Sequence, residues 1–366
     1  MFISKNNHLT NIKRIRIPEN RDLKNGLRLN RNERVENWGS EIVKDIFSNK
    51  PDWFLSVYPD SSSIYEKLCN HISVNESQIM LTSGMDGAIK TIYEIMTEPG
   101  DQVGLPGPTY AMYYVYSDLF QTNLTEIQYL PETLKLDWHQ LNEFIDSKPI
   151  VVFLPNPNQP IEDSLSNDQI STIAERTLKN GTLLVIDEAY YMFGATSAID
   201  LIEEFENLVI LRTFSKGFGV PSIRFGYMIS NEDNMDVLNK TRFAYETNSL
   251  RNAVAEYLLD NYNLVDDYVQ KVINGRNYVK DELKKIGIKC NGDTANYLLV
   301  DLVNCEKRDK TVAFLEENLV YVKGNFNSPW DKYMLITVGP VELMEKFVDL
   351  LAIANKKYKL NENQSS

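Results

Sequence analysis

The sequence predicts an α/β protein with a large domain built on a mainly parallel sheet flanked by helices, and a smaller α+β domain. Between residues 77 and 230, short apolar runs alternate with helical patterns, as in βαβ units. Two runs, Ile150–Leu154 and Leu183–Ile186, are continuously apolar, as expected of strands covered by helices on both faces. The length of 366 residues also exceeds that of most single domains, which indicates two.

Strands and helices of the large domain are expected to alternate along the chain. The expected strands are Ile79–Thr82, Gln102–Leu105, Ile150–Leu154, Thr182–Ile186, Leu208–Leu211 and Ile223–Ile229. The expected helices are Met85–Met96, Tyr110–Leu119, Asn167–Leu178 and Ala198–Phe205. Because each crossover contains a helix, most neighbouring strands should run parallel.

The rest of the chain predicts the smaller domain. From about Arg251, long amphipathic stretches precede shorter segments of alternating polarity. The expected strands there are Tyr297–Val303, Val320–Lys323 and Met334–Val338, joined by the N-terminal segment around Leu27–Glu33. We therefore assign residues 41–250 to the large domain, and residues 1–40 and 251–366 to the small domain.

Composition and charge exclude several classes of function. The net charge of −13 argues against nucleic-acid binding, which depends on a basic surface. No stretch approaches the ~20 apolar residues of a membrane span, so we expect a soluble, cytoplasmic protein. The chain has three cysteines and three histidines without ligand spacing, so no metal site is predicted. These residues are Cys69, Cys290, Cys305, His8, His71 and His139.

Ligands of α/β sheets bind outside the carboxyl ends of the strands, so polar residues that follow an apolar strand are candidate site residues. Gly84, Met85 and Asp86 follow the first strand and open a helix, where backbone N–H groups and the helix dipole favour a phosphate. The alternative is a plain tight turn. Asp187 ends another strand, where a buried carboxylate needs a positive partner such as a protonated pyridine nitrogen. The alternative is an acidic helix cap.

Lys216 follows the strand Leu208–Leu211 in a turn flanked by glycine. A partly desolvated lysine can lose its proton and form a Schiff base with a carbonyl, although most lysines are surface charges. Arg224 opens the next apolar segment and could bind a phosphate together with Ser215. The alternative is an arginine on an edge strand that faces water. The strand Ile150–Leu154 is followed by the proline- and asparagine-rich stretch Pro155–Pro160, which is ordinarily a turn. Its amides could hydrogen-bond an aromatic hydroxyl.

Together and in this order, these places resemble the fold-type-I aminotransferases of class I/II, most closely the histidinol-phosphate aminotransferase group. The resemblance covers nearly the whole chain, and the ordered set of motifs is far more specific than any single one. The motifs are Leu29–Glu33, Tyr58–Asp60, Gly84–Asp86, Pro108–Tyr113, Asn156–Asn158, Asp187–Tyr190, Thr213–Lys216, Arg224, Asn296–Tyr297 and Ile336–Gly339.

The resemblance implies pyridoxal 5'-phosphate as cofactor and a role for each motif residue. Lys216 would hold the cofactor as a Schiff base and shuttle a proton, and Asp187 would keep the pyridine nitrogen protonated. Tyr190 would bond the ring hydroxyl and Tyr110 would stack on the ring. The cofactor phosphate would be bound by Gly84, Met85, Asp86, Thr213, Ser215 and Arg224. Tyr58 would reach the phosphate of the neighbouring subunit, which implies a homodimer with a shared active site.

Three positions depart from the family pattern. The family asparagine that contacts the ring hydroxyl falls at Gln159, and Asn158 is the alternative. The arginine that precedes Ile-Thr-Val-Gly in the family, and binds the substrate α-carboxylate, is Leu335 here. A second family arginine corresponds to Lys323. Arg31 occupies a position of the N-terminal motif that usually holds a small residue in the family. Its side chain either faces the substrate, which would partly compensate for the missing arginines, or lies in solvent.

The leading hypothesis is an aminotransferase that moves an amino group to or from a small, phosphorylated or otherwise anionic substrate. The second hypothesis keeps the cofactor but replaces amino transfer with decarboxylation of a phosphorylated amino acid, because the arginine that would orient the α-carboxylate is missing. The third is a catalytically silent binding domain of the same fold. The presence of Lys216, Asp187 and Arg224 together argues against this third hypothesis.

Overall fold

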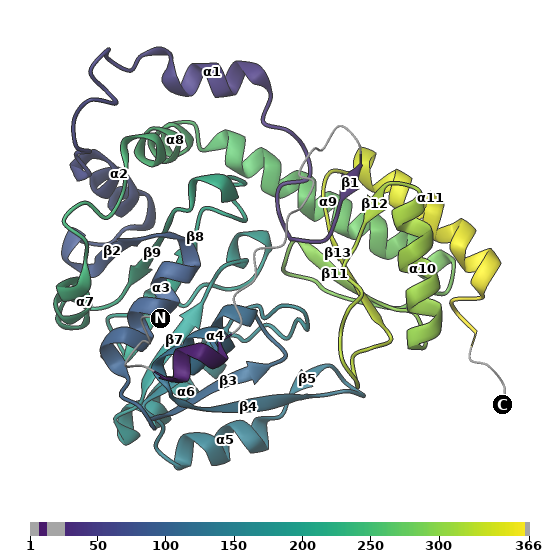
Figure 1. Ribbon diagram of the computed structural model, residues 1–366, viewed down its shortest axis with the longest axis horizontal. Coiled ribbons are helices and arrows are strands. Elements are labelled where there is room, and N and C mark those ends of the chain that lie inside the picture. The colour runs from purple at the N-terminus through teal and green to yellow at the C-terminus, as the bar shows by residue number, and fades with distance from the viewer. Residues whose placement is uncertain (1–6, 13–25, 363–366) are drawn as a thin grey trace.

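An eight-stranded sheet forms the centre of the computed structural model, which describes residues 7–12 and 26–362 (Figure 1). Its strands are β2 (Ile79–Thr82), β3 (Gln102–Gly107), β4 (Asn123–Leu130), β5 (Lys135–Leu136), β6 (Val151–Pro155), β7 (Leu183–Asp187), β8 (Leu208–Thr213) and β9 (Gly226–Ile229). Their order is β2-β9-β8-β7-β6-β3-β4-β5. The run from β8 to β4 is parallel, whereas β9 is antiparallel to both its neighbours and β5 is antiparallel to β4. The expected mainly parallel sheet is confirmed.

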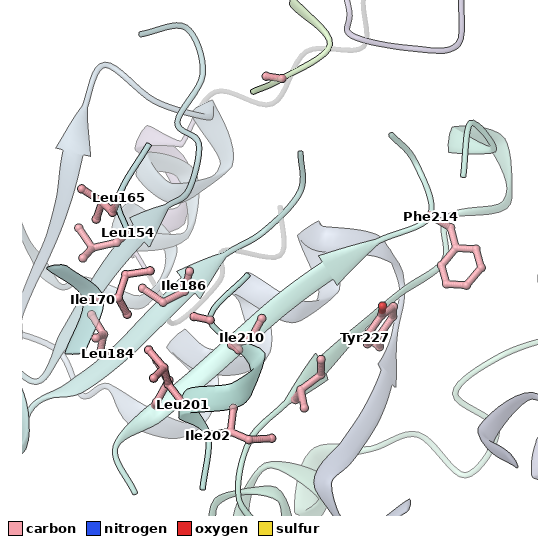
Figure 2. Close-up of a cluster of buried hydrophobic side chains, with 14 of the residues drawn as sticks. Leu154, Leu165, Ile170, Leu184, Ile186, Leu201, Ile202, Ile210, Phe214 and Tyr227 are labelled. Atoms are coloured by element: carbon pink, nitrogen blue, oxygen red, sulfur yellow. The ribbon is translucent and has the colours of Figure 1, made fainter. Parts of the chain in front are cut away.

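Helices cover both faces of this sheet. They are α2 (Ser62–Ile72), α3 (Gly84–Met96), α4 (Ala111–Phe120), α5 (Trp138–Asp146), α6 (Asn167–Asn180), α7 (Glu232–Leu238) and α8 (Ser249–Asp260). Successive residues of a strand point to opposite faces. In β6, Val151 and Phe153 therefore join the apolar cluster of α3, α4 and α7. Val152 and Leu154 join the cluster of α2, α5, α6 and α8, part of which is drawn in Figure 2.

A smaller part of the chain lies beside the sheet, on the right in Figure 1. It contains β1 (Leu27–Arg28), β10 (Cys290–Asn291), β11 (Tyr297–Asp301), β12 (Val320–Tyr321), β13 (Tyr333–Thr337), α9 (Asn263–Lys285), α10 (Cys305–Glu317) and α11 (Val341–Tyr358). The strands β10, β11 and β13 form an antiparallel sheet, and β1 pairs with β12 in parallel. This part has an apolar core of its own, to which Leu29 of the N-terminal segment contributes. The domain boundaries themselves stay a prediction.

The helix expected at Ala198–Phe205 is wrong, because only the 3-10 turn Ile199–Leu201 forms there. The buried Glu188 carboxylate accepts a hydrogen bond from the backbone N–H of Ala198 at 2.6 Å and fixes the start of this segment. The apolar side chains of this segment still reach the core. Their helix-like spacing in the sequence therefore reflects burial and not a helix.

The strand expected at Ile223–Ile229 begins later than predicted, at Gly226. Pro221 to Ile223 form a 3-10 turn, and Arg224 adopts a left-handed conformation with φ 52°. This turn directs the Arg224 side chain back toward β8 and α3. The strand β4 and the helix α5 were not expected, because β4 alternates polar and apolar residues and lacks a continuous apolar run.

Two further observations concern membrane spans and metal sites. Within the described residues, no helix is long and apolar enough to cross a membrane. The same part of the chain contains no group of three or more His, Cys, Asp or Glu side chains placed to hold a metal ion.

A buried ion pair anchors the segment after β7 and generates a stability prediction. The Arg212 Nε donates to the Glu188 carboxylate at 2.9 Å, and both side chains are almost fully buried. In Glu188→Gln the guanidinium stays buried without a counter-charge, which should cost about 3–5 kcal/mol of unfolding free energy. Urea unfolding measures this loss. The matched control, Asp146→Asn, breaks the more exposed pair with Arg176 and should cost less than about 1 kcal/mol. Equal losses in the two variants would contradict the prediction.

Candidate active site

A cavity of about 1000 Å³ opens where the carboxyl ends of β6, β7 and β8 meet the smaller part of the chain. The sheet side supplies Met85, Asp86, Thr109, Tyr110, Gln159, Asp187, Tyr190, Thr213, Ser215, Lys216 and Arg224. The other side supplies Asn30, Arg31, Asn32, Glu33, Arg308, Asp309, Val312, Val322, Lys323, Gly324, Asn325 and Leu335. The structure therefore brings most of the residues expected from the sequence into one cavity, which is large enough for a cofactor and a small substrate.

Lys216 lies in the loop that follows β8, with its amine inside the cavity. The Nζ atom donates hydrogen bonds to the backbone oxygens of Asn32 at 3.0 Å and Arg31 at 3.3 Å. Burial lowers the pKa of the Lys216 amine to about 8, against the opposing effect of the Glu33 carboxylate. About a tenth of this amine is therefore unprotonated at pH 7, far more than for a lysine of ordinary pKa, and the unprotonated form is the nucleophile.

Asp187 ends β7 and is buried at the floor of the cavity. Its carboxylate accepts hydrogen bonds from the Tyr113 hydroxyl at 2.8 Å and from the Ala189 backbone N–H at 2.9 Å. Burial raises the pKa of Asp187 to about 6 despite these bonds. A cationic ring nitrogen next to this carboxylate would restore its charged form. Sequence reasoning missed Tyr113, although it belongs to the motif Pro108–Tyr113.

The start of α3 and the Arg224 side chain form a candidate anion site. The Ser83 side chain does not cap α3, which leaves the first N–H groups of this helix for a ligand. Gly84 has φ +68°, and a Cβ there would lie 2.9 Å from Nη2 of Arg224, so only glycine leaves this space open. Arg224 also contacts the Ser215 hydroxyl at 3.4 Å and the Asp86 carboxylate at 3.1 Å.

The remaining cofactor candidates lie around this centre. The Thr213 hydroxyl donates to the Ser215 hydroxyl at 3.0 Å, next to Arg224. The Tyr110 hydroxyl donates to the Asp86 carboxylate at 2.7 Å, which holds the ring at the cavity wall. The Tyr190 hydroxyl accepts a hydrogen bond from the Asn32 side chain at 3.1 Å. Met85 lines the cavity with them.

Asn158 and Gln159 have different surroundings. The Asn158 side chain is fully buried, where it accepts from the Thr109 hydroxyl at 2.6 Å and donates to the Pro108 and Ile161 backbone oxygens. Gln159 lines the cavity. Of the two alternatives, Gln159 is therefore placed to meet a ligand, and Asn158 shapes the loop.

Tyr58 lies outside this cavity on the surface. It is 75% exposed, and its ring stacks on that of Tyr245 with the centroids 4.3 Å apart. Tyr58 therefore does not line the cavity of its own chain. Its expected contact with the cofactor phosphate of a neighbouring subunit stays a prediction. Arg308 is the opposite case, because it lines the cavity although sequence reasoning did not select it.

A parallel sheet with a half-buried lysine of lowered pKa and a buried carboxylate at its carboxyl edge has the features of the pyridoxal-phosphate enzymes of fold type I. The family model of the class I and II aminotransferases matches residues 28–351. The chain therefore belongs to the class I and II aminotransferase family. A curated relative, the histidinol-phosphate aminotransferase of Caldanaerobacter subterraneus subsp. tengcongensis, is 32% identical over 291 residues, which cover 78% of this chain and 82% of the relative.

Solved structures share the fold. The histidinol-phosphate aminotransferase of Sinorhizobium meliloti, solved in complex with pyridoxal-5'-phosphate, superposes with a TM-score of 0.81 at 20% identity, covering 90% of this chain and 91% of that one. The L-threonine-O-3-phosphate decarboxylase of Porphyromonas gingivalis gives a TM-score of 0.72 at 19% identity, covering 91% and 99%. The expected fold type, enzyme class and pyridoxal-phosphate cofactor are confirmed at the level of the family.

The lowered pKa of Lys216 predicts how its reactivity depends on pH. Only the unprotonated amine reacts with an electrophile, so a pKa lowered to about 8 shifts the rise in reactivity to lower pH. We expect reductive methylation of Lys216, followed by peptide mass spectrometry in the chain without cofactor, to have its midpoint near 8. A free lysine peptide in the same tube should titrate near ~10.4. Identical curves for Lys216 and the peptide would contradict the assigned environment.

Proposed function

We propose that this protein is a cytoplasmic pyridoxal-phosphate-dependent aminotransferase that moves an amino group to or from a small phosphorylated substrate. The observation that carries the proposal is that Lys216 and the buried Asp187 line one cavity beside the uncapped start of α3. When bound, the cofactor supplies an electron-accepting ring that stabilises negative charge on the substrate carbon. The names of the curated relatives make L-histidinol phosphate the first compound to test.

Each cavity residue has a role that follows from its position. Lys216 holds the cofactor and then moves a proton at the substrate carbon, for which its lowered pKa is suited. Asp187 would pair with the ring nitrogen of the bound cofactor, and the Tyr113 hydroxyl orients its carboxylate. Tyr190 and Gln159 would bind the ring hydroxyl, and Tyr110 would stack on the ring.

The start of α3 and the residues around Arg224 would hold the cofactor phosphate. The backbone N–H groups of Gly84, Met85 and Asp86 would supply donors, and Thr213 and Ser215 would supply hydroxyls. Arg224 would supply the positive charge, because a guanidinium can bind two phosphate oxygens at once. At present Arg224 contacts the Asp86 carboxylate, so a phosphate would compete with that side chain. Arg31 and Lys323 would contact the substrate.

Decarboxylation of a phosphorylated amino acid is the second candidate, and Leu335 favours it. The family arginine at this position would hold the α-carboxylate of the substrate in place, whereas the apolar Leu335 cannot bind a carboxylate. Loss of that carboxylate as carbon dioxide would then compete with loss of the α-hydrogen. Release of 2-oxoglutarate with glutamate as donor supports amino transfer, and release of carbon dioxide supports decarboxylation.

The shared active site requires a homodimer, which the surface around Tyr58 supports. The helix α1 (Ser40–Ser48) buries none of its residues within the chain and lies apart from the sheet in Figure 1. Large apolar side chains are exposed on this helix, after it and near Tyr245. They are Val43, Phe47, Trp53, Leu55, Val57, Phe243, Tyr245 and Leu250. Exposed apolar surface of this extent is typical of a protein interface.

Replacing Lys216 tests the cofactor role. Lys216→Ala should abolish turnover and the cofactor that borohydride traps on the chain, while the fold persists because the residues around Gly84 remain. Amino transfer from glutamate and the absorbance after borohydride reduction are the measurements. Lys90→Ala, which removes an exposed lysine of α3, is the matched control and should behave as wild type. Normal turnover in Lys216→Ala would show that another residue holds the cofactor.

Hybrid dimers test the role of Tyr58. Tyr58→Ala and Lys216→Ala chains, each inactive alone, should regain activity when mixed, because a hybrid contains one site with both residues intact. Activity is measured after separately tagged chains have been co-purified, which verifies the hybrids. If such hybrids stay inactive, Tyr58 does not serve the partner's site.

A further inference from the structure

Three cations gather on the wall of the cavity that belongs to the smaller part of the chain. Arg308 comes from α10, Lys323 follows β12, and Arg31 follows β1. Burial lowers the pKa of Lys323, and the nearby Arg31 guanidinium lowers it further. These two cations are thus close enough to repel each other. In a chain with a net charge of −13, such a cluster indicates a ligand with negative charge.

Arg308 is buried to an extent that is uncommon for arginine. Its residue exposure is 7%, although it belongs to a helix rich in charged side chains. Its Nε atom forms an ion pair with the Asp309 carboxylate at 2.7 Å, whereas Nη1 has no hydrogen-bond partner within the described chain. A buried donor without an acceptor is costly, and an anionic ligand in the cavity would supply one to Nη1.

Gly324 allows Arg308 to reach this position. A Cβ at residue 324 would lie 2.9 Å from Cδ of Arg308 and 2.6 Å from Cγ2 of Val312. The Arg308 side chain therefore lies directly over the Gly324 backbone, beside Lys323. Any larger residue at 324 would displace it.

Leu335 occupies the position at which the family resemblance implies a substrate-binding arginine. Its backbone exchanges two hydrogen bonds with Lys323, at 2.8 and 3.0 Å, so the two side chains lie on the same face of this antiparallel pair. Leu335 and Arg308 both line the cavity. The guanidinium that strand β13 lacks is thus present on the neighbouring helix α10.

We propose that Arg308, together with Lys323 and Arg31, binds a phosphate monoester of the substrate in place of the missing arginine at position 335. A phosphate monoester carries close to two negative charges and three strong acceptor oxygens, which matches a cluster of three cations better than a single carboxylate does. The three residues of this site belong to the smaller part of the chain, whereas Gly84 and Arg224, the candidate cofactor-phosphate site, belong to the sheet side of the same cavity. The inference rests on the proposed function, because it names the residue that selects the substrate of that reaction.

The test compares L-histidinol phosphate with L-histidinol, two amines that differ only in the phosphate. In the wild-type holoenzyme the phosphorylated amine should have the higher kcat/KM. In Arg308→Gln this preference, the ratio of the two kcat/KM values, should fall about tenfold to a hundredfold. Arg308→Lys, which keeps the charge but loses the planar fork, should retain part of the preference. Cofactor absorbance shows that each variant is folded and loaded.

Lys310→Gln is the matched control, because it removes a positive charge from an exposed side chain of the same helix. It should leave the preference unchanged. A preference within about threefold of wild type in Arg308→Gln would overturn the inference. An equal loss in Lys310→Gln would also overturn it, because a general effect of net charge would then suffice.

Calorimetric titration of inorganic phosphate into the loaded enzyme separates this inference from the proposed reaction. If neither amine reacts but Arg308→Gln abolishes phosphate binding that the wild type shows, the reaction is wrong and the phosphate site holds. If both amines react and the variant binds phosphate as wild type does, the inference alone fails. Binding of succinate that depends on Arg308, without binding of phosphate, would also overturn the assignment to a phosphate.

Discussion

The Asp187 carboxylate is enclosed at the end of β7 between paired residues of β6 and β8, Pro155 and Leu211. Burial alone would favour its neutral form and raises its pKa to about 6, even with the Tyr113 hydroxyl and a backbone N–H bonded to it. The chain therefore maintains a costly group where a cation can stabilise it. Lys216 on the next strand's loop completes the arrangement, because its own burial favours the neutral amine. Burial thus raises the pKa of Asp187 and lowers the pKa of Lys216, and the chemistry proposed for this protein depends on both shifts.

Asn32 connects this centre to the smaller part of the chain. Its backbone oxygen accepts from Lys216, its side chain donates to the Tyr190 hydroxyl, and its backbone N–H donates to the Thr337 hydroxyl at 2.8 Å. The Asn296 side chain donates to the same backbone oxygen at 3.2 Å. The position of the reactive amine is therefore coupled to β13. A shift of the smaller part relative to the sheet would change the surroundings of Lys216.

The two sides of the cavity divide the work. The carboxyl edge of the parallel sheet supplies the lysine, the carboxylate and the uncapped helix start, which together define the cofactor chemistry. The smaller part supplies Arg31, Lys323, Arg308 and Leu335, which line the cavity and which in the proposed function would contact the substrate. Relatives with the same fold can thus keep one chemistry and change the substrate through a few residues on the opposite wall.

Continuous apolar strands and the polar residues that follow them were predictable from the sequence, because a buried parallel strand is apolar on both faces and its carboxyl end is where ligands collect. This reasoning made Asp187, Lys216 and Arg224 candidates, and the resemblance of the ordered motifs to the aminotransferases then decided in their favour. The sequence could not exclude a helix at Ala198–Phe205, since periodicity reports burial and not the backbone bonds to Glu188 that replace the helix. It could not select Arg308 either, because a charged run on α10 reads as solvated surface. The Arg308 side chain is buried and lines the cavity only because that helix packs over Gly324 in the tertiary structure.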